Sequence, residues 1–169
     1  MKIKIIYFFL IVTTLVGCTS NQVAQTNSQG AQMEKCKATS KKEIAALFDR
    51  WNRSLQTGNS HEVVANYAKR SILLPTVSNI PRFTPAEKVA YFDHFLKDGP
   101  YGKIDMQFIE LGCNTAFDAG LYTFTYAKTK KSDSARYTYT YRWNGSKWLI
   151  TSHHSSLMPE ESTSIKKGI

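Results

Sequence analysis

The first half of the chain is patterned as helices. One apolar stripe recurs at helical spacing and comprises Ile44, Leu47, Phe48, Trp51 and Leu55. It follows Ser40 and Glu43, which are spaced as a capping box, and it precedes Gly58, a residue type typical of helix C-termini. We therefore predict an amphipathic helix that begins at Ser40 and ends near Gly58.

Two shorter helices and a short strand are predicted next. The first of these helices runs from about Ser60 to Tyr67, and residues 72–74 form a short apolar strand that Pro75 ends. The segment 84–87 combines a second capping box with proline at the first helical position. The buried face of the helix that follows is Val89, Phe92, Phe95 and Leu96.

After Tyr101 the apolar period changes from helical to two, which is typical of half-buried strands. The alternating segments are residues 104–108, 122–126, 137–143 and 148–156. Asn144-Gly145 is a hairpin turn sequence, and residues 117–120 predict another tight turn. Helices followed by an antiparallel meander predict an α+β fold, with the helices on one face of a curved antiparallel sheet.

The N-terminal segment has the pattern of an export signal. Lys2 and Lys4 precede an apolar run, residues 5–16, which is shorter than the roughly 20 residues that a membrane-spanning helix needs. It ends in Leu15-Val16-Gly17-Cys18, which resembles the lipobox of bacterial lipoproteins. The resemblance implies cleavage before Cys18, lipidation of its thiol and attachment to a membrane through that lipid. An ordinary secreted protein is the alternative.

These features divide the chain into a signal peptide (1–17), a lipidated flexible tether (18–39), a folded domain (40–160) and a disordered tail (161–169). Residues 19–35 are rich in Ser, Thr, Asn and Gln, a composition that cannot bury enough apolar surface to fold. Because Thr19 is not aspartate, resemblance to the sorting of diderm lipoproteins predicts the periplasmic face of the outer membrane.

The sequence contains 3 cysteines. With Cys18 assigned to the lipid, Cys36 and Cys113 remain in an exported and therefore oxidising environment. A disulfide between them would attach the N-terminal segment to the sheet. Two unpaired buried thiols are the alternative.

Several short motifs of the folded segment together resemble one family. They are Ala45–Asn52, Leu73–Thr76, Gly112–Ala116, Ala119–Tyr122, Lys147–Ile150 and His153–Glu160. They resemble the nuclear-transport-factor-2-like (SnoaL-like) superfamily, and within it the SgcJ/EcaC-type family close to the association (hub) domain of calcium/calmodulin-dependent protein kinase II. The resemblance covers residues 40–160 and includes no catalytic signature.

The resemblance implies a cystatin-like cone, in which a strongly bent antiparallel sheet wraps around N-terminal helices and encloses a pocket. It also implies homodimers formed sheet against sheet, or larger rings. It does not extend to kinase activity or calmodulin binding, because the sequence has no kinase motif and an exported protein would not meet calmodulin. Since this fold carries many chemistries, the function has to be argued from the site itself.

His154 is the best candidate for a catalytic residue. On the last strand, the alternation that starts at Trp148 and Ile150 places His154 on the same face, which the apolar members predict to point into the cone. A half-buried histidine can exchange a proton near neutral pH, and a structural, hydrogen-bonded histidine is the alternative. His153 would then lie on the outer face. No carboxylate has metal-ligand spacing to a histidine, so we expect no metal and no cofactor.

Four tyrosines complete the predicted pocket, namely Tyr67, Tyr91, Tyr139 and Tyr141. Tyr139 aligns with a position at which kinase hub domains carry a pocket arginine, so the resemblance implies that the anion-binding role of that arginine has no counterpart here. An aromatic wall would suit a small planar or apolar ligand, and core packing is the alternative. Asp93 is expected on a solvent-facing helix side and Asp118 in a turn, which leaves no evident acid–base pair.

The formal net charge of +9 points to no nucleic-acid partner, because the basic residues are scattered along the chain and no stacking platform accompanies them. Proximity to anionic lipid is the more natural context. Two hypotheses follow. The first is a membrane-tethered association or ligand-binding module that forms homo-oligomers without catalysis. The second is a small-molecule enzyme of the isomerase, cyclase or oxidoreductase-associated type that uses His154 and pocket tyrosines.

Overall fold

The computed structural model describes residues 35–160 of the chain. The predicted signal peptide, the lipidation site Cys18, most of the tether (18–39) and the tail (161–169) lie outside the described residues. Within the described range, no helix is long and apolar enough to span a lipid bilayer.

Helix α1 (Lys41–Gln56) is the amphipathic helix predicted from the first apolar stripe. Ser40 caps it, because its side chain accepts a hydrogen bond from the backbone N–H of Glu43. The stripe is buried, and no member is more than 7% exposed: Ile44, Leu47, Phe48, Trp51 and Leu55. Burial of this apolar face, more than intrinsic helix propensity, stabilises the helix.

Two shorter helices follow α1. Helix α2 (Ser60–Val64) ends before Tyr67, which begins a strand and does not end a helix as predicted. Helix α3 (Pro85–Phe95) has the predicted capping box at its start. A single 3₁₀ turn, η1 (Leu96–Asp98), continues it and ends at Gly99, whose φ of +64° favours glycine.

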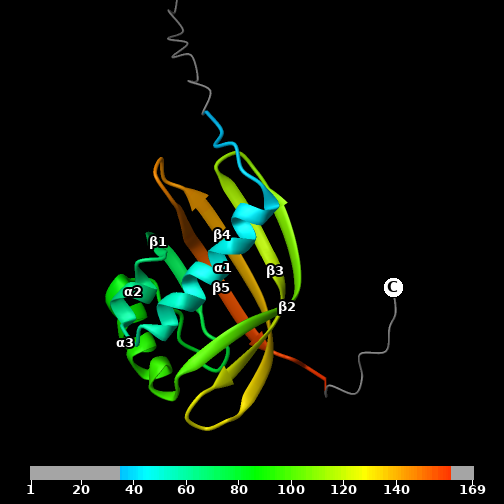
Figure 1. Cartoon of the computed structure of the whole chain (residues 1–169). Helices are drawn as coiled ribbons and strands as arrows, with labels where there is room; N and C mark the ends of the chain where they lie inside the picture. Colours follow the sequence, from blue (N-terminus) through cyan, green and yellow to red (C-terminus); the bar gives the residue numbers. More distant parts are fainter. Residues whose placement is uncertain (1–34, 161–169) are drawn as a thin grey trace, which may run out of the picture. The chain divides into compact units, whose positions relative to one another are not determined.

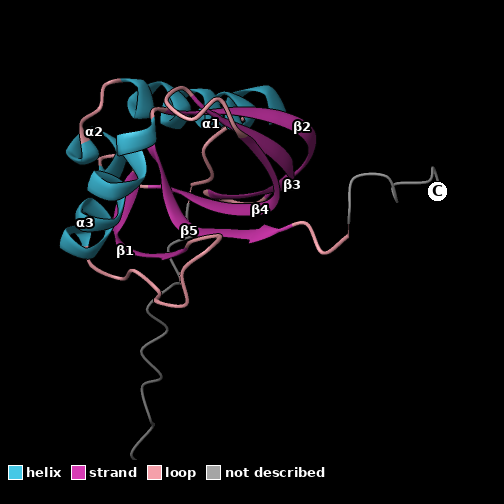
Figure 2. Ribbon diagram, turned by 90° about the horizontal axis from the view of Figure 1, so that it is seen from below, coloured by secondary structure: helices cyan, strands magenta, loops and turns pink. Residues whose placement is uncertain are grey.

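Five strands form one sheet in the order β1-β5-β4-β3-β2. They are β1 (Tyr67–Leu74), β2 (Pro100–Leu111), β3 (Thr115–Tyr126), β4 (Ser132–Trp143) and β5 (Trp148–Leu157). Strand β1 runs parallel to β5, and the other neighbouring pairs are antiparallel. Figure 1 shows α1 lying across the sheet, and Figure 2 shows the strands curving around the helices. The predicted α+β cone is therefore confirmed, with one parallel edge that the sequence did not indicate.

A bulge in β2 bends the sheet next to Gly120. The register of β2 with β3 shifts between Ile104 and Met106. A Cβ atom on Gly120 would lie 2.8 Å from the carbonyl carbon of Met106, so glycine is needed where the two backbones approach each other. Residues 117–120 are therefore part of β3, and the tight turn predicted for them is wrong.

The core between α1 and the sheet is aromatic. Phe48 and Trp51 of α1 contact the rings of Tyr122, Tyr137 and Tyr139, with ring centroids 6.1 to 6.5 Å apart. Aromatic contacts of this kind add about 0.5–1.5 kcal/mol each beyond the area they bury. The alternating tyrosines of β4 thus face inward, as the period of two predicts.

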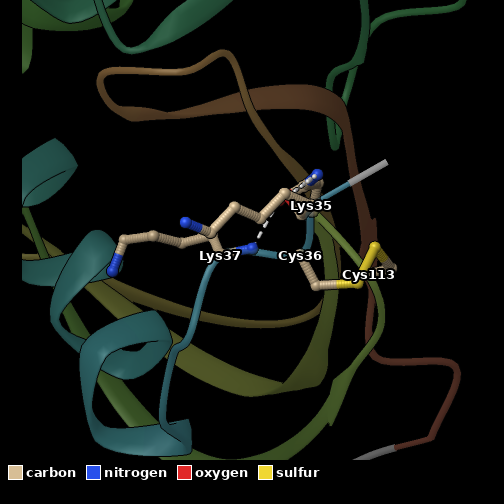
Figure 3. Close-up of a disulfide and its surroundings, with 5 residues drawn as sticks. Lys35, Cys36, Lys37 and Cys113 are labelled. Atoms are coloured by element: carbon tan, nitrogen blue, oxygen red, sulfur yellow. Dashed lines mark hydrogen bonds between the residues drawn. A yellow bond between two sulfur atoms is a disulfide. The ribbon is translucent and has the colours of Figure 1, made fainter. Parts of the chain in front are cut away.

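The segment before α1 is fixed to the turn between β2 and β3. Cys36 and Cys113 form a disulfide (Figure 3), which confirms the predicted pairing, and Cys113 lies in the turn between the two strands. Asn114 reinforces this link. Its side chain accepts a hydrogen bond from the N–H of Lys37 at 2.8 Å and donates one to the carbonyl of Lys35 at 3.1 Å. The folded domain therefore includes the segment that directly precedes α1.

Candidate functional site

The two adjacent histidines of β5 have the opposite orientations to those predicted. The register of β4 with β5 shifts between Thr140 and Tyr141, which leaves Thr151 of β5 as a bulge. Behind a bulge, the inward and outward faces of a strand exchange places. His153 is accordingly buried in the cone at 4% exposure, while His154 is exposed on the outer face. The prediction of His154 as the pocket histidine is wrong for this reason.

His153 is held in place by a hydroxyl and an aromatic ring. Its Nδ1 atom lies 2.8 Å from the hydroxyl of Tyr67, and its ring stacks on Tyr139 with centroids 4.2 Å apart. Burial lowers the pKa of His153 to about 3, and the charge of His154 contributes in the same direction. The imidazole is therefore neutral at neutral pH. Within the described part of the chain, its buried Nε2 atom has no hydrogen-bond partner.

A cluster of hydroxyl groups lies two residues further along β5. Ser155 is 5% exposed, and its Oγ atom accepts a hydrogen bond of 2.6 Å from the hydroxyl of Tyr122 on β3. The hydroxyl of Thr76, which follows β1, is also hydrogen-bonded to Ser155. Burial raises the pKa of Tyr122, so this phenol keeps its proton. Three uncharged hydroxyl groups from three segments thus meet at one point.

These groups line a small cavity inside the cone. The cavity has a volume of about 40 Å³, and its polar lining includes His153, Ser155, Tyr122 and Thr76. Its apolar walls are Trp51, Leu73, Pro75, Phe92, Phe95 and Phe124. We call this the inner cavity. It combines an apolar wall with a few convergent hydrogen-bonding groups, the pattern typical of small-molecule sites.

A larger and more open cavity of about 350 Å³ adjoins the inner cavity, and we call it the outer cavity. The residues that line both are Thr76, Tyr91, Phe95, Phe124 and Tyr126. The outer cavity also carries charged or titratable side chains, namely His94, Asp98, Lys131 and Asp133. The site thus passes from an uncharged interior to a charged mouth.

Two tyrosines between these cavities remain protonated at neutral pH. Burial raises the pKa of Tyr91 to about 12. Burial, together with the charges of Asp133 and Asp98, raises the pKa of Tyr126 to about 12. Both phenols can therefore donate a hydrogen bond, but neither provides a negative charge.

The four predicted pocket tyrosines have different roles. Tyr91 lines both cavities, as predicted, and Tyr67 reaches the site only through its hydrogen bond to His153. Tyr139 and Tyr141 are buried in the core and line neither the inner nor the outer cavity, although Tyr141 lies in the lining of a third cavity beside Leu111 and Phe117. Burial raises the pKa of both, and among the described residues their hydroxyl groups have no hydrogen-bond partner.

Asp118 is a buried carboxyl group in the middle of β3, although the sequence predicted it in a turn. It accepts hydrogen bonds from the hydroxyl of Tyr137 at 3.0 Å and from the side-chain amide of Gln107 at 3.1 Å. Burial raises its pKa against the opposing effect of these two hydrogen bonds. Since Asp118 lines neither cavity, it belongs to the core and not to the site.

Sequence reasoning missed three members of the site: Thr76, Tyr122 and Ser155. Tyr122 was assigned to a strand, but nothing local distinguishes it from a core tyrosine. Ser155 lies two residues beyond His153 and would have been found had the bulge at Thr151 been foreseen. Over residues 35–160, no three His, Cys, Asp or Glu side chains gather as a metal site would need.

A family model described as the calcium/calmodulin-dependent protein kinase II association domain matches residues 40–159. The chain belongs to this association-domain family. Its solved relatives include a protein from Xanthomonas campestris that is described as such a domain. That protein is 44% identical over 76% of this chain and 98% of its own, with a TM-score of 0.68.

Two more distant structures show the fold that this association domain shares. One is a nuclear-transport-factor-2-like protein with a cystatin-like fold from Novosphingobium aromaticivorans, with 15% identity, a TM-score of 0.61 and coverage of 72% of this chain and 84% of that one. The other is the iota-carbonic anhydrase from a cyanobacterium, complexed with bicarbonate, with 20% identity, a TM-score of 0.65 and coverage of 73% and 95%. A search of curated proteins gave no match.

Proposed function

We propose that the inner cavity binds carbon dioxide and bicarbonate and that the protein interconverts them. The observation that carries this proposal is the meeting of three hydroxyl groups, from Thr76, Tyr122 and Ser155, in the lining of one cavity with His153. Among the described residues, the buried Nε2 atom of His153 has no hydrogen-bond partner. A buried polar atom without a partner is costly, and a small polar ligand in the cavity would satisfy it.

The size of the inner cavity limits the ligand to a few atoms. One water molecule needs roughly 10–15 Å³ of such volume, so a cavity of about 40 Å³ holds a molecule of about three or four heavy atoms. Carbon dioxide and bicarbonate have this size, and bicarbonate is planar. The inner cavity alone is far smaller than drug-sized ligand sites, which measure about 300–1,000 Å³, so a larger substrate would have to occupy the outer cavity as well.

The chemistry of hydration suits the groups present. The oxygen of a water molecule forms a bond to the carbon of carbon dioxide, one carbon–oxygen π pair moves onto oxygen, and the water loses a proton. Tyr122 donates its single O–H to Ser155, and Ser155 and Thr76 share one further hydrogen bond, so this pair keeps one O–H that can be donated to the oxygen that gains charge. Their lone pairs can accept a hydrogen bond from the attacking water. His153 offers its free nitrogen as a further hydrogen-bonding group for the same water. The apolar wall favours entry of uncharged carbon dioxide.

The bicarbonate-bound iota-carbonic anhydrase supports the proposal as a protein of the same fold with a ligand of this size. At 20% identity the likeness shows the fold alone, so the argument for this chain rests on its own hydroxyl cluster.

The test is a stopped-flow measurement of carbon dioxide hydration with the full chain in detergent and a pH indicator. We expect hydration faster than the uncatalysed reaction, and broadening of the ¹³C resonance of bicarbonate when protein is added. The same protein, reduced and denatured, is the control. Hydration at the uncatalysed rate, together with an unchanged bicarbonate resonance, would contradict the proposal.

A second function, association of copies of the chain, is favoured by an apolar patch on the outer face of the sheet. Its members are 38–52% exposed: Met106, Phe108 and Phe117. Phe108 pairs with Ala119 and Phe117 with Glu110, which places the two phenylalanines diagonally on adjacent strands. We propose that two copies meet through this patch, in keeping with the name of the family.

Changing Phe117 to lysine should weaken this association, because a charge at the centre of an apolar interface lacks a partner. We expect the dissociation constant of the dimer to rise by about 100-fold or more in sedimentation velocity. Ile80→Lys is the matched control, since Ile80 is 62% exposed and lies in the loop between β1 and α3. A wild-type domain that sediments as a monomer at high micromolar concentration would argue against association.

We also propose that the domain is tethered to a membrane through Cys18 at the periplasmic face of the outer membrane. This proposal rests on the N-terminal pattern alone, because Cys18 lies outside the described residues. Incorporation of a labelled fatty acid in the wild type, but not in Cys18→Ser, is the expected result. Equal labelling of both would refute it.

A further inference from the structure

The inner cavity lacks a group that can carry away the proton released by hydration. The pKa of His153 is about 3, so its imidazole does not hold a proton at neutral pH. Tyr91 and Tyr126 have pKa values of about 12 and do not release theirs. The proton must therefore leave the interior before it meets a base, and the lining of the outer cavity is the first place that offers one.

His94 is the imidazole in that lining. It lies in the last turn of α3, is exposed to solvent, and lines the outer cavity of about 350 Å³. Tyr91, one helical turn earlier on the same helix, lines both the outer and the inner cavity. A single helix face thus connects the hydroxyl-lined interior with an imidazole that contacts solvent.

We propose that His94 is the proton-transfer residue of this site, accepting the proton that hydration releases in the inner cavity and passing it to buffer bases in solution. The inference rests on the proposed carbonic anhydrase function. In the balanced reaction, carbon dioxide and water yield bicarbonate and one proton. His94 takes up that proton and returns to its neutral form when a buffer base removes it.

His94 has charged neighbours of both signs around it. The titratable or charged groups that share its two surface cavities or its helix turn are Arg82, Glu87, Tyr91, Asp93, Lys97, Asp98, Tyr126, Lys131 and Asp133. The carboxylates among them offset the lysines and the arginine. The last turn of a helix carries the negative end of the helix dipole, which accommodates a cation.

The lining residues that the two cavities share mark the place at which water could pass from the inner to the outer cavity. The outer cavity has room for many water molecules, at roughly 10–15 Å³ each. Hydroxyl groups of Thr76 and Tyr91 lie in the lining shared by both cavities and can hydrogen-bond to the first of these waters.

The experiment compares wild type with His94→Ala in dilute and in concentrated imidazole buffer. For His94→Ala we expect hydration to fall by about 10-fold or more in dilute buffer and to recover in concentrated imidazole, which replaces the lost side chain. Exchange of ¹⁸O between carbon dioxide and bicarbonate at equilibrium should stay at the wild-type rate, because that interconversion needs no net release of a proton to solvent.

His61→Ala and His154→Ala are the matched controls, since both histidines are exposed and neither lines the two cavities. Both should retain the wild-type rate in dilute buffer. A His94→Ala variant as fast as wild type in dilute buffer would overturn the assignment of His94 as the proton-transfer residue. So would a variant whose hydration and isotope exchange fall together without recovery, because that indicates a structural role. A wild type without hydration activity would overturn the proposed function as well, whereas the other outcomes leave that function intact.

Discussion

Ser155→Ala is expected to lower kcat/KM for carbon dioxide hydration by about 100-fold, the usual effect of removing one donor that stabilises a developing oxyanion. Ser155 is the common partner of the other two hydroxyl groups, because Tyr122 donates to its Oγ atom at 2.6 Å and Thr76 is bonded to the same atom. Its loss therefore removes one hydrogen-bonding group and releases two more from fixed positions. We expect kcat to fall more than KM rises, since the bonds matter most as charge develops.

Ser156→Ala is the matched control for this prediction. Ser156 is the next residue of β5 but faces outward, where its Oγ atom accepts a hydrogen bond of 3.2 Å from the guanidinium of Arg136. It should keep the wild-type kcat/KM. If both serine variants lost activity equally, the loss would reflect a general disturbance of β5, and the hydroxyl cluster would not be the active site. Urea unfolding of each variant separates activity loss from stability loss.

The helices could be predicted because their signals are local. The capping boxes at Ser40 and Thr84 and the apolar stripe that contains Trp51 lie within one or two helical turns. Each of these features specifies its own hydrogen bonds and buried face without reference to distant residues. The antiparallel sheet could be predicted for the same reason, because each strand shows its own alternation. The parallel pairing of β1 with β5 joins two strands that are far apart in the sequence, and no local pattern specifies it.

The exchanged histidines and the mistaken turn at residues 117–120 both lie next to β-bulges. A bulge depends on the register between two strands, so neither strand reveals it alone. The extra residue at Thr151 exchanged the orientations of His153 and His154. The bulge in β2 turned Gly120 from an apparent turn residue into a close backbone contact, which also moved Asp118 from a predicted turn into the core. In this domain, alternation predicts which strands exist, and bulges decide which side chains reach the cavity.

A buried lysine links the site to the loop that supplies one of its hydroxyl groups. The ammonium of Lys88 on α3 donates hydrogen bonds to the carbonyl of Ser71 at 2.9 Å and to that of Phe83 at 2.7 Å. These two carbonyls lie on either side of the segment that contains Thr76. Burial lowers the pKa of Lys88, while the charge of Glu87 opposes that effect. The lysine thus joins both ends of this segment to one helix and restrains the position of Thr76.

Gly120→Ala is expected to lower the free energy of unfolding by about 3 kcal/mol or more, the upper part of the range for overpacking. Its new Cβ atom would lie 2.8 Å from the carbonyl carbon of Met106 and 3.1 Å from the Cα atom of Gln107. These are backbone atoms in a hydrogen-bonded strand, so relief requires the bulge itself to shift. Because Tyr122 lies two residues further along β3, the shift should also weaken its bond to Ser155 and reduce activity in the fraction that folds.

Gly112→Ala, in the turn between β2 and β3, is the control that separates this backbone clash from the effect of a methyl group that meets a movable side chain. A Cβ atom there would lie 2.5 Å from the Oγ1 atom of Thr115, which can rotate away, so we expect a loss below about 1 kcal/mol. Urea denaturation with the disulfide intact measures both values. If Gly120→Ala were as stable as Gly112→Ala, the bulge in β2 would be deformable at low cost. The curvature of the cone, and with it the position of Tyr122 in the inner cavity, would then need another cause.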